Sequence, residues 1–132
     1  MQDGRAREIV EGALARSGAE REAWVRDACG DDAALRADVE AILKLVRSAR
    51  PGQGNAETDK HVAWGPGPRA SQALTLCARA RALYDGRLAP SVDDVAALAE
   101  PVLQHRMALT FAARAEGMSV RDVIDGLVKA SG

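Results

Sequence analysis

The residues best placed to do chemistry lie in Trp64-Gly-Pro-Gly-Pro-Arg-Ala-Ser71, where a stiff segment leads an arginine into a predicted helix. Pro68 suits the first helical position, and we expect Gly65 and Gly67 to adopt backbone angles closed to other residues. Arg69 would then lie beside unpaired backbone N–H groups, at the positive end of the helix dipole. This arrangement favours binding of an anion, phosphate above all. An ordinary loop-to-helix junction with a solvated arginine is the alternative, and spacing alone does not decide between the two.

Composition indicates an all-α fold. The chain has 132 residues, enough for one domain or a small domain with an appended piece. Apolar residues make up 47% of the chain and alanine is the commonest of them, while only 3% of residues are aromatic. This composition favours closely packed helices. The net charge of −1 gives no general attraction to nucleic acid or anionic membranes. Because no apolar run has the length of a signal or a membrane span, we expect a cytoplasmic protein without membrane contact.

Side chains that often build catalytic or metal sites are scattered along the chain. The cysteines and histidines follow no zinc spacing, so no metal site is expected: Cys29, Cys77, His61 and His105. Ser71, Ser91 and the acidic pairs at 31–32 and 93–94 suit helix starts better than a nucleophile and its base. We therefore expect no catalytic residue.

Four arginines could in principle bind nucleic acid: Arg69, Arg79, Arg81 and Arg87. Few aromatic side chains accompany them, so nucleic acid is not an expected partner. The last three lie near the predicted end of a helix, where solvated cations interact well with the dipole. Solvated charge is therefore the simplest interpretation of these three.

Hydrophobic periodicity predicts the helices that would position Arg69. Three short helices, over about 6–16, 19–28 and 32–47, precede a polar, Gly-containing segment at 50–59 that predicts a flexible loop. Further helices are expected from 91 to about 99, from 101 to 115 with Phe111 buried, and from 119 onward, because Glu100-Pro101 allows a break. The helix that carries Arg69 is predicted over 68–85, with an apolar face made of Ala73, Leu76, Cys77, Ala80, Leu83 and Tyr84.

From about Val39 to Lys129 the sequence resembles the C-terminal lid subdomain of the MoxR group of AAA+ ATPases. The matching segments are Ile42–Pro51, Gly65–Leu74, Ala78–Leu83, Asp85–Arg87, Ser91–Val95, Leu98–Leu103, His105-Arg106 and Asp122–Ile124. In that family Gly-x-x-Pro-Arg is the sensor 2 region. The resemblance implies that Arg69, presented by Gly67 and Pro68, reaches the terminal phosphates of a nucleotide from a helical bundle at 39–132.

The motifs of the ATPase core are not found in these 132 residues. They contain no G-x-x-x-x-G-K-[ST] and no apolar strand that ends in Asp-Glu. We therefore expect an isolated or truncated lid that hydrolyses no ATP by itself. ATP and Mg²⁺ would be bound only together with a complementary AAA+ core, and the expected partner is that core or a neighbouring ATPase subunit.

Residues 1–38 form a predicted helical extension with a second, weaker resemblance. Its Ala28-Cys-x-x-Asp-x-x-Leu-Arg-x-x-Val39 run is similar to the helical segment ahead of many bacterial serine/threonine kinase domains. No catalytic residue follows from that resemblance. The chain could be a fusion across 39–43, or a lid whose extension merely resembles the kinase segment. In an alternative function, the helical hairpin within this extension binds a protein partner. The whole chain is then a non-catalytic helical adaptor.

Overall fold

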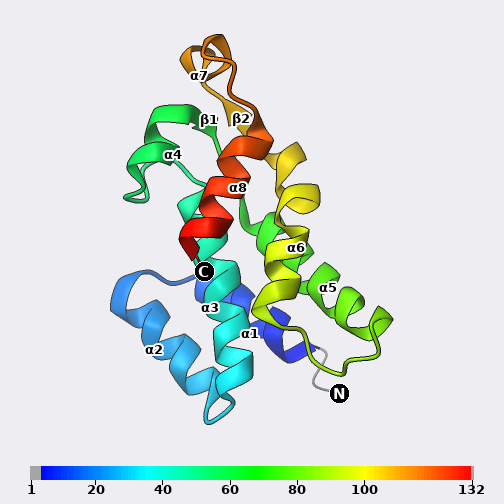
Figure 1. The fold of residues 1–132 in the computed structure, drawn as a ribbon. Coiled ribbons are helices and arrows are strands. Elements are labelled where there is room, and N and C mark those ends of the chain that lie inside the picture. The colour runs from blue at the N-terminus through cyan, green and yellow to red at the C-terminus, as the bar shows by residue number, and fades with distance from the viewer. Residues whose placement is uncertain (1–3, 132) are drawn as a thin grey trace.

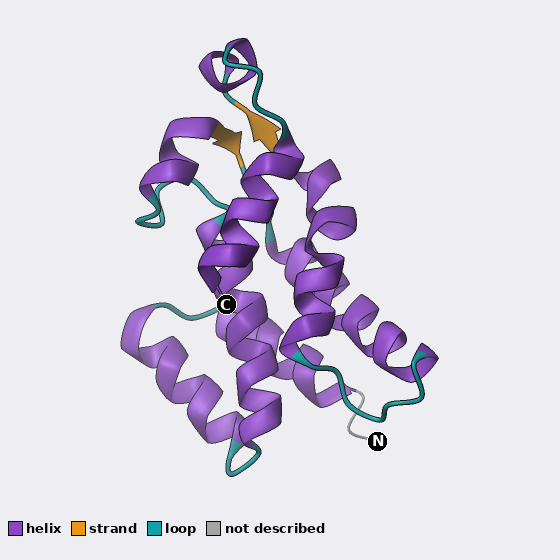
Figure 2. Ribbon diagram, viewed as in Figure 1, coloured by secondary structure: helices purple, strands orange, loops and turns teal. Residues whose placement is uncertain are grey.

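The computed structural model describes residues 4–131 as a helical bundle with one small antiparallel sheet (Figures 1 and 2). This architecture confirms the predicted all-α class. Within the described residues, no helix is long and apolar enough to cross a membrane. Along the chain the elements are α1 (Arg5–Leu14), α2 (Gly18–Cys29), α3 (Ala33–Ser48), α4 (Ala56–His61), β1 (Val62–Trp64), α5 (Pro68–Tyr84), α6 (Val92–Leu103), the 3₁₀ helix η2 (Gln104–Arg106), β2 (Ala108–Leu109), α7 (Phe111–Ala115) and α8 (Val120–Ser131).

Helices α1 and α2 form the N-terminal hairpin, and they pack against each other through Trp24 of α2. Its indole Nε1 donates a hydrogen bond to the carbonyl of Ile9, 3.1 Å away, and the Arg16 guanidinium lies 4.0 Å from the ring centroid. Gly12 lets the ring approach, since a Cβ there would lie 2.5 Å from ring atoms. The hairpin shares one hydrophobic core with the rest of the bundle, and Val10 and Ile124 belong to the same cluster. Helix α3 runs through residue 38, where the two predicted segments of the chain meet.

The loop after α3 is shorter than the predicted segment at 50–59. Helix α4 begins at Ala56, because the Asn55 side chain accepts a hydrogen bond from the Thr58 N–H at 3.1 Å. Thr58 is itself buried and donates its hydroxyl to the Ser48 carbonyl at the end of α3. These contacts correct the extent of the predicted loop, which ends at Asn55.

Helix α5 buries a face that differs for the most part from the predicted one. Of the predicted residues, Ala73 and Cys77 pack partly buried against the core, whereas the larger ones are exposed. The side chains turned into the bundle are mostly small: Ala70, Ser71, Leu74, Thr75, Ala78 and Ala82. They allow α1, α3 and α6 to pack against the helix (Figure 1). Leu76 and Leu83, predicted to face the core, are 63% and 56% exposed. The apolar periodicity located the helix correctly, but the prediction was wrong for Leu76, Ala80, Leu83 and Tyr84, because small residues permit the closest helix packing.

Helix α6 continues through Pro101 to Leu103, so the predicted break at Glu100-Pro101 is wrong. Val95, Val102 and Leu103 are buried on both sides of the proline, and this burial holds the helix together despite the lost backbone donor. A single helix over 101–115 is also wrong, because η2 and β2 intervene. Phe111, predicted to be buried, starts α7 and is 88% exposed.

The connection from α5 to α6 is held by the fully buried carboxylate of Asp94. Arg87 binds it through two hydrogen bonds of 2.7 Å, and the Arg81 guanidinium binds the same carboxylate. The backbone N–H of Ser91 donates to it at 2.7 Å, which forms the capping contact of α6. The Arg87 hydrogen bonds outweigh burial and hold the pKa of Asp94 well below its usual range. The prediction that Arg81 and Arg87 are solvated charges was therefore wrong.

A close approach between backbones fixes the segment that leads into α5. A Cβ at Gly65 would lie 2.4 Å from the carbonyl oxygen of Ala49 and 2.9 Å from the Cα of Arg50. No other residue type fits this contact with the end of α3. At Gly67, in contrast, no atom lies within 4 Å of a Cβ position.

We expect Asp94→Asn to lower the free energy of unfolding by about 3 kcal/mol, because two arginines lose their buried partner. Since the folded pKa of Asp94 is depressed, the stabilisation is fully present above about pH 4 and declines as the pH falls further. Urea unfolding at neutral and acidic pH measures both effects. Asp93→Asn, at an exposed position next to it, is the matched control and should change stability by less than about 0.5 kcal/mol.

Gly65→Ala and Gly67→Ala form a second matched pair. The first forces α3 and the segment before α5 apart and should cost about 1–3 kcal/mol, measured by thermal or urea unfolding. The second meets open space at extended backbone angles and should be nearly neutral. Equal losses in the two variants would contradict the close-approach explanation.

Candidate functional site

The segment before α5 presents the helix start at the surface. Trp64 in β1 is exposed, Pro66 is buried, and Pro68 occupies the first turn of α5 as predicted. Gly67 has φ −95° and ψ −169°, an extended conformation open to any residue, and Gly65 is not among the glycines with positive φ. The predicted use of unusual backbone angles at these two glycines was therefore wrong, and at Gly65 the absent side chain is what matters.

The N-terminus of α5 carries no negative charge of its own. It has no side-chain cap and no acidic residue in its first turn. By comparison, α3 is capped by Asp32, α4 by Asn55 and α7 by Thr110. The free N–H groups and the dipole at the start of α5 are therefore available to an external anion.

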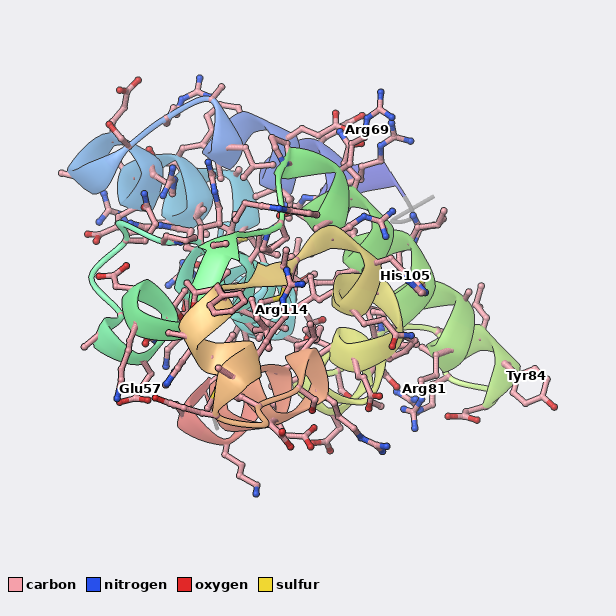
Figure 3. All side chains as sticks on the ribbon, turned by 90° about the horizontal axis from the view of Figure 1, so that it is seen from above. Glu57, Arg69, Arg81, Tyr84, His105 and Arg114 are labelled. Carbon is pink, nitrogen blue, oxygen red and sulfur yellow. The ribbon has the colours of Figure 1, made fainter. Side chains whose placement is uncertain are left out.

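Arg69 lies at this helix start and is exposed. Among the residues that the structure describes, none forms a hydrogen bond or ion pair with its guanidinium. Figure 3 shows its side chain pointing away from the bundle. A guanidinium in this position can meet a phosphate with two parallel N–H donors while the helix dipole adds to the attraction.

The other three arginines that the sequence suggested do not join Arg69. Arg79, Arg81 and Arg87 lie toward the far end of α5, and Arg81 is about 18 Å along the helix axis from Arg69 at 1.5 Å per residue. Figure 3 shows Arg69 and Arg81 well separated. Arg81 and Arg87 bind Asp94, and Arg79 has an interaction of its own. The four cations therefore do not form one patch for a nucleic-acid backbone.

The face of α5 that carries Arg69 is an exposed apolar stripe, which we define as Leu76, Ala80 and Leu83. At 100° per residue these three positions lie within about 40° of Arg69 around the helix. Tyr84 extends the stripe at the far end of α5, where Figure 3 shows its ring projecting outward. Sequence reasoning found these residues but assigned them to the core. Their exposure beside one cation is typical of a surface that another protein covers.

Comparison with known proteins identifies a family and a relative that share this architecture. Residues 54–127, more than half of the chain, match the family model described as the AAA lid domain. The chaperone MoxR1 of Mycobacterium tuberculosis is 34% identical over 93 residues, which are 69% of this chain and 25% of MoxR1. The chain thus spans about a quarter of the length of that relative.

A crystal structure from Cytophaga hutchinsonii, of a protein provisionally named an ATPase, has the same fold. It superposes with a TM-score of 0.64 over 86% of this chain and 43% of its own, at 21% sequence identity. The family match, the curated relative and the shared fold agree with one another. This chain is a member of the AAA lid domain family, of the MoxR type of AAA+ ATPases.

Proposed function

We propose that this chain acts as the lid of a MoxR-type AAA+ ATPase and contributes Arg69 to a nucleotide site that an AAA+ core completes. The chain covers only a quarter of MoxR1, so the phosphate loop and the magnesium ligands of such a site would come from the core. Within the described residues, no group of three or more His, Cys, Asp or Glu could hold a metal ion. The lid would supply a cation and a helix N-terminus.

One observation carries this proposal: the exposed stripe of α5 lies on the same face as Arg69. A helix that exposes large apolar side chains such as Leu76 and Leu83 lowers its free energy when a second surface covers them. Docking of that surface would place Arg69 against whatever the covering protein binds. If the covering protein is a nucleotide-binding core, Arg69 faces the nucleotide.

The chemistry of the side chain fits this role. Phosphoryl transfer places negative charge on the β- and γ-phosphate oxygens, and cations positioned around them stabilise the transition state. An arginine on a separate lid can sense the γ-phosphate, because its binding energy draws the lid toward the core. Lysine lacks the planar fork of donors and should replace arginine incompletely.

The first test adds this chain to a lid-free AAA+ core of a MoxR-type ATPase and measures the affinity of a fluorescent ATP analogue. We expect wild-type chain to tighten nucleotide binding at least tenfold, Arg69→Lys to restore part of that gain and Arg69→Ala to remove it. Arg26→Ala, an exposed arginine on α2, is the matched control and should behave as wild type. The chain without a core should hydrolyse no ATP.

A nucleotide effect that is the same with Arg69→Ala would reject the sensing role. Binding of the core without any nucleotide effect would instead favour the non-catalytic adaptor. ATP turnover by the purified chain alone would reject the lid interpretation altogether.

The second test concerns the stripe. Leu76→Asp and Leu83→Asp place charge on the proposed contact surface and should weaken association with the core at least tenfold, measured by calorimetry. Neither change should destabilise the chain, because both side chains are mostly exposed. Phe111→Asp removes an even more exposed apolar side chain on α7 and serves as the control, with core binding retained.

A further inference from the structure

A pocket lies where the N-terminal hairpin meets the lid, away from Arg69. Its residues come from α1, from the first half of α3, from the last turns of α5 and from the connection to α6. Apolar side chains form most of its wall, among them Ala6, Leu35, Leu83 and Pro90. Leu88 stands at this pocket and is 92% exposed, so an occupant could still cover it. Leu83 belongs both to this pocket and to the stripe proposed to contact the core, but neither the family comparison nor the proposed nucleotide site accounts for the buried acid that lines the pocket.

Asp38 of α3 lines the pocket and is only 6% exposed. Among residues 4–131, none gives its carboxylate a hydrogen bond or an ion pair. The contrast with Asp94 is direct, since that carboxylate is also buried but has two arginines and a backbone N–H. Burial of an unpaired carboxylate is costly, so Asp38 does not contribute to stability as it stands.

The charges around Asp38 do not neutralise it. Burial is the main cause that raises the pKa of Asp38 to about 6, and the negative charges of Asp94 and Asp32 raise it further. On α1, the Arg5 guanidinium donates to the carbonyl of Ala28, 2.9 Å away, at the end of α2. On α5, Arg79 also lines the pocket and has its own interaction. The connection to α6 contributes Leu88, Ala89 and Pro90, which carry no charge.

From this geometry we infer that the pocket binds a primary ammonium group on a short alkyl chain. The ammonium would donate hydrogen bonds to the Asp38 carboxylate, and the methylene groups would lie against Leu35, Leu83 and Leu88. Asp32 also lines the pocket, but its side chain accepts the hydrogen bond that caps α3. Asp38 is the buried carboxylate left to bind a compact cation with three donors. The same chemistry is offered by a free alkylamine and by a lysine side chain of another protein.

The test titrates the ¹⁵N-labelled chain with butylammonium chloride and follows amide chemical shifts. We expect saturable shifts at residues around the pocket. Asp38→Asn should weaken the affinity at least tenfold, and n-butanol, with the same chain and no charge, should bind at least tenfold more weakly to the wild type. Between about pH 7.5 and about pH 5 the affinity of butylammonium should fall about tenfold, because Asp38 becomes protonated.

Two further variants separate the role of Asp38 from general effects of charge and from apolar contact. Asp125→Asn removes an exposed carboxylate on α8 and should leave the affinity unchanged. Leu88→Ala changes an exposed side chain, so the fold should not suffer, and it should weaken binding several-fold through lost apolar contact. Equal affinity of butylammonium for wild type and Asp38→Asn would overturn the inference, as would the absence of saturable shifts.

A further arm distinguishes the source of the amine. An acetylated, amidated Ala-Ala-Lys-Ala-Ala peptide is compared with its norleucine counterpart. Tighter binding of the lysine peptide than of butylammonium would identify a protein side chain as the occupant. Tighter binding of butylammonium would identify a small free amine.

Discussion

The arrangement of the whole bundle depends on the small-residue face of α5. Ala70, Ala78 and Ala82 let α1, α3 and α6 pack close to the helix axis, which larger side chains would prevent. Because a helix has only one face to bury, the choice of this face forces Leu76 and Leu83 outward. The same rotation places Arg69 at the surface. Core packing and the exposed candidate site are thus two consequences of one helix orientation.

The two ends of α5 are fixed by different means. At its start, the absent side chain of Gly65 allows the backbone to touch the end of α3. At its end, Gly86 adopts a positive φ of 78° and Arg87 folds back to bind the buried carboxylate of Asp94. A steric contact and an ion-pair network thus hold a helix whose exposed face makes little contribution of its own. Arg69 is therefore carried on a rigid support, which the proposed recognition of a phosphate group would require.

Asp94 and Asp38 are both buried, but they differ in their hydrogen-bond partners and in the direction in which their pKa is shifted. Asp94 has donors on every side, and its pKa falls. Asp38 has none among the described residues, and its pKa rises. The first fastens α5 to α6, while the second lies where the hairpin and the lid meet. Two candidate binding regions are therefore proposed along α5, Arg69 at its start and the Asp38 pocket near its end, and Leu83 lies between the exposed stripe and the pocket.

The sequence alone determined the helical class, most helix positions, a helix start at the acidic pair 31–32, another at Ser91, and the position of Arg69 at a helix start. These features depend on residues close together in the chain, where periodicity and capping act locally. It also carried the resemblance to the lid family, which the comparisons confirm.

Only the tertiary structure decided which face of α5 is buried, that Arg81 and Arg87 bind Asp94, and that none of residues 4–131 pairs with Asp38. It also decided that α6 continues through Pro101 and that Gly65 is needed for its small size. Each of these depends on residues that are distant in sequence or on the space between helices. Apolar periodicity says that a helix has two faces, but the shapes of its neighbours choose between them.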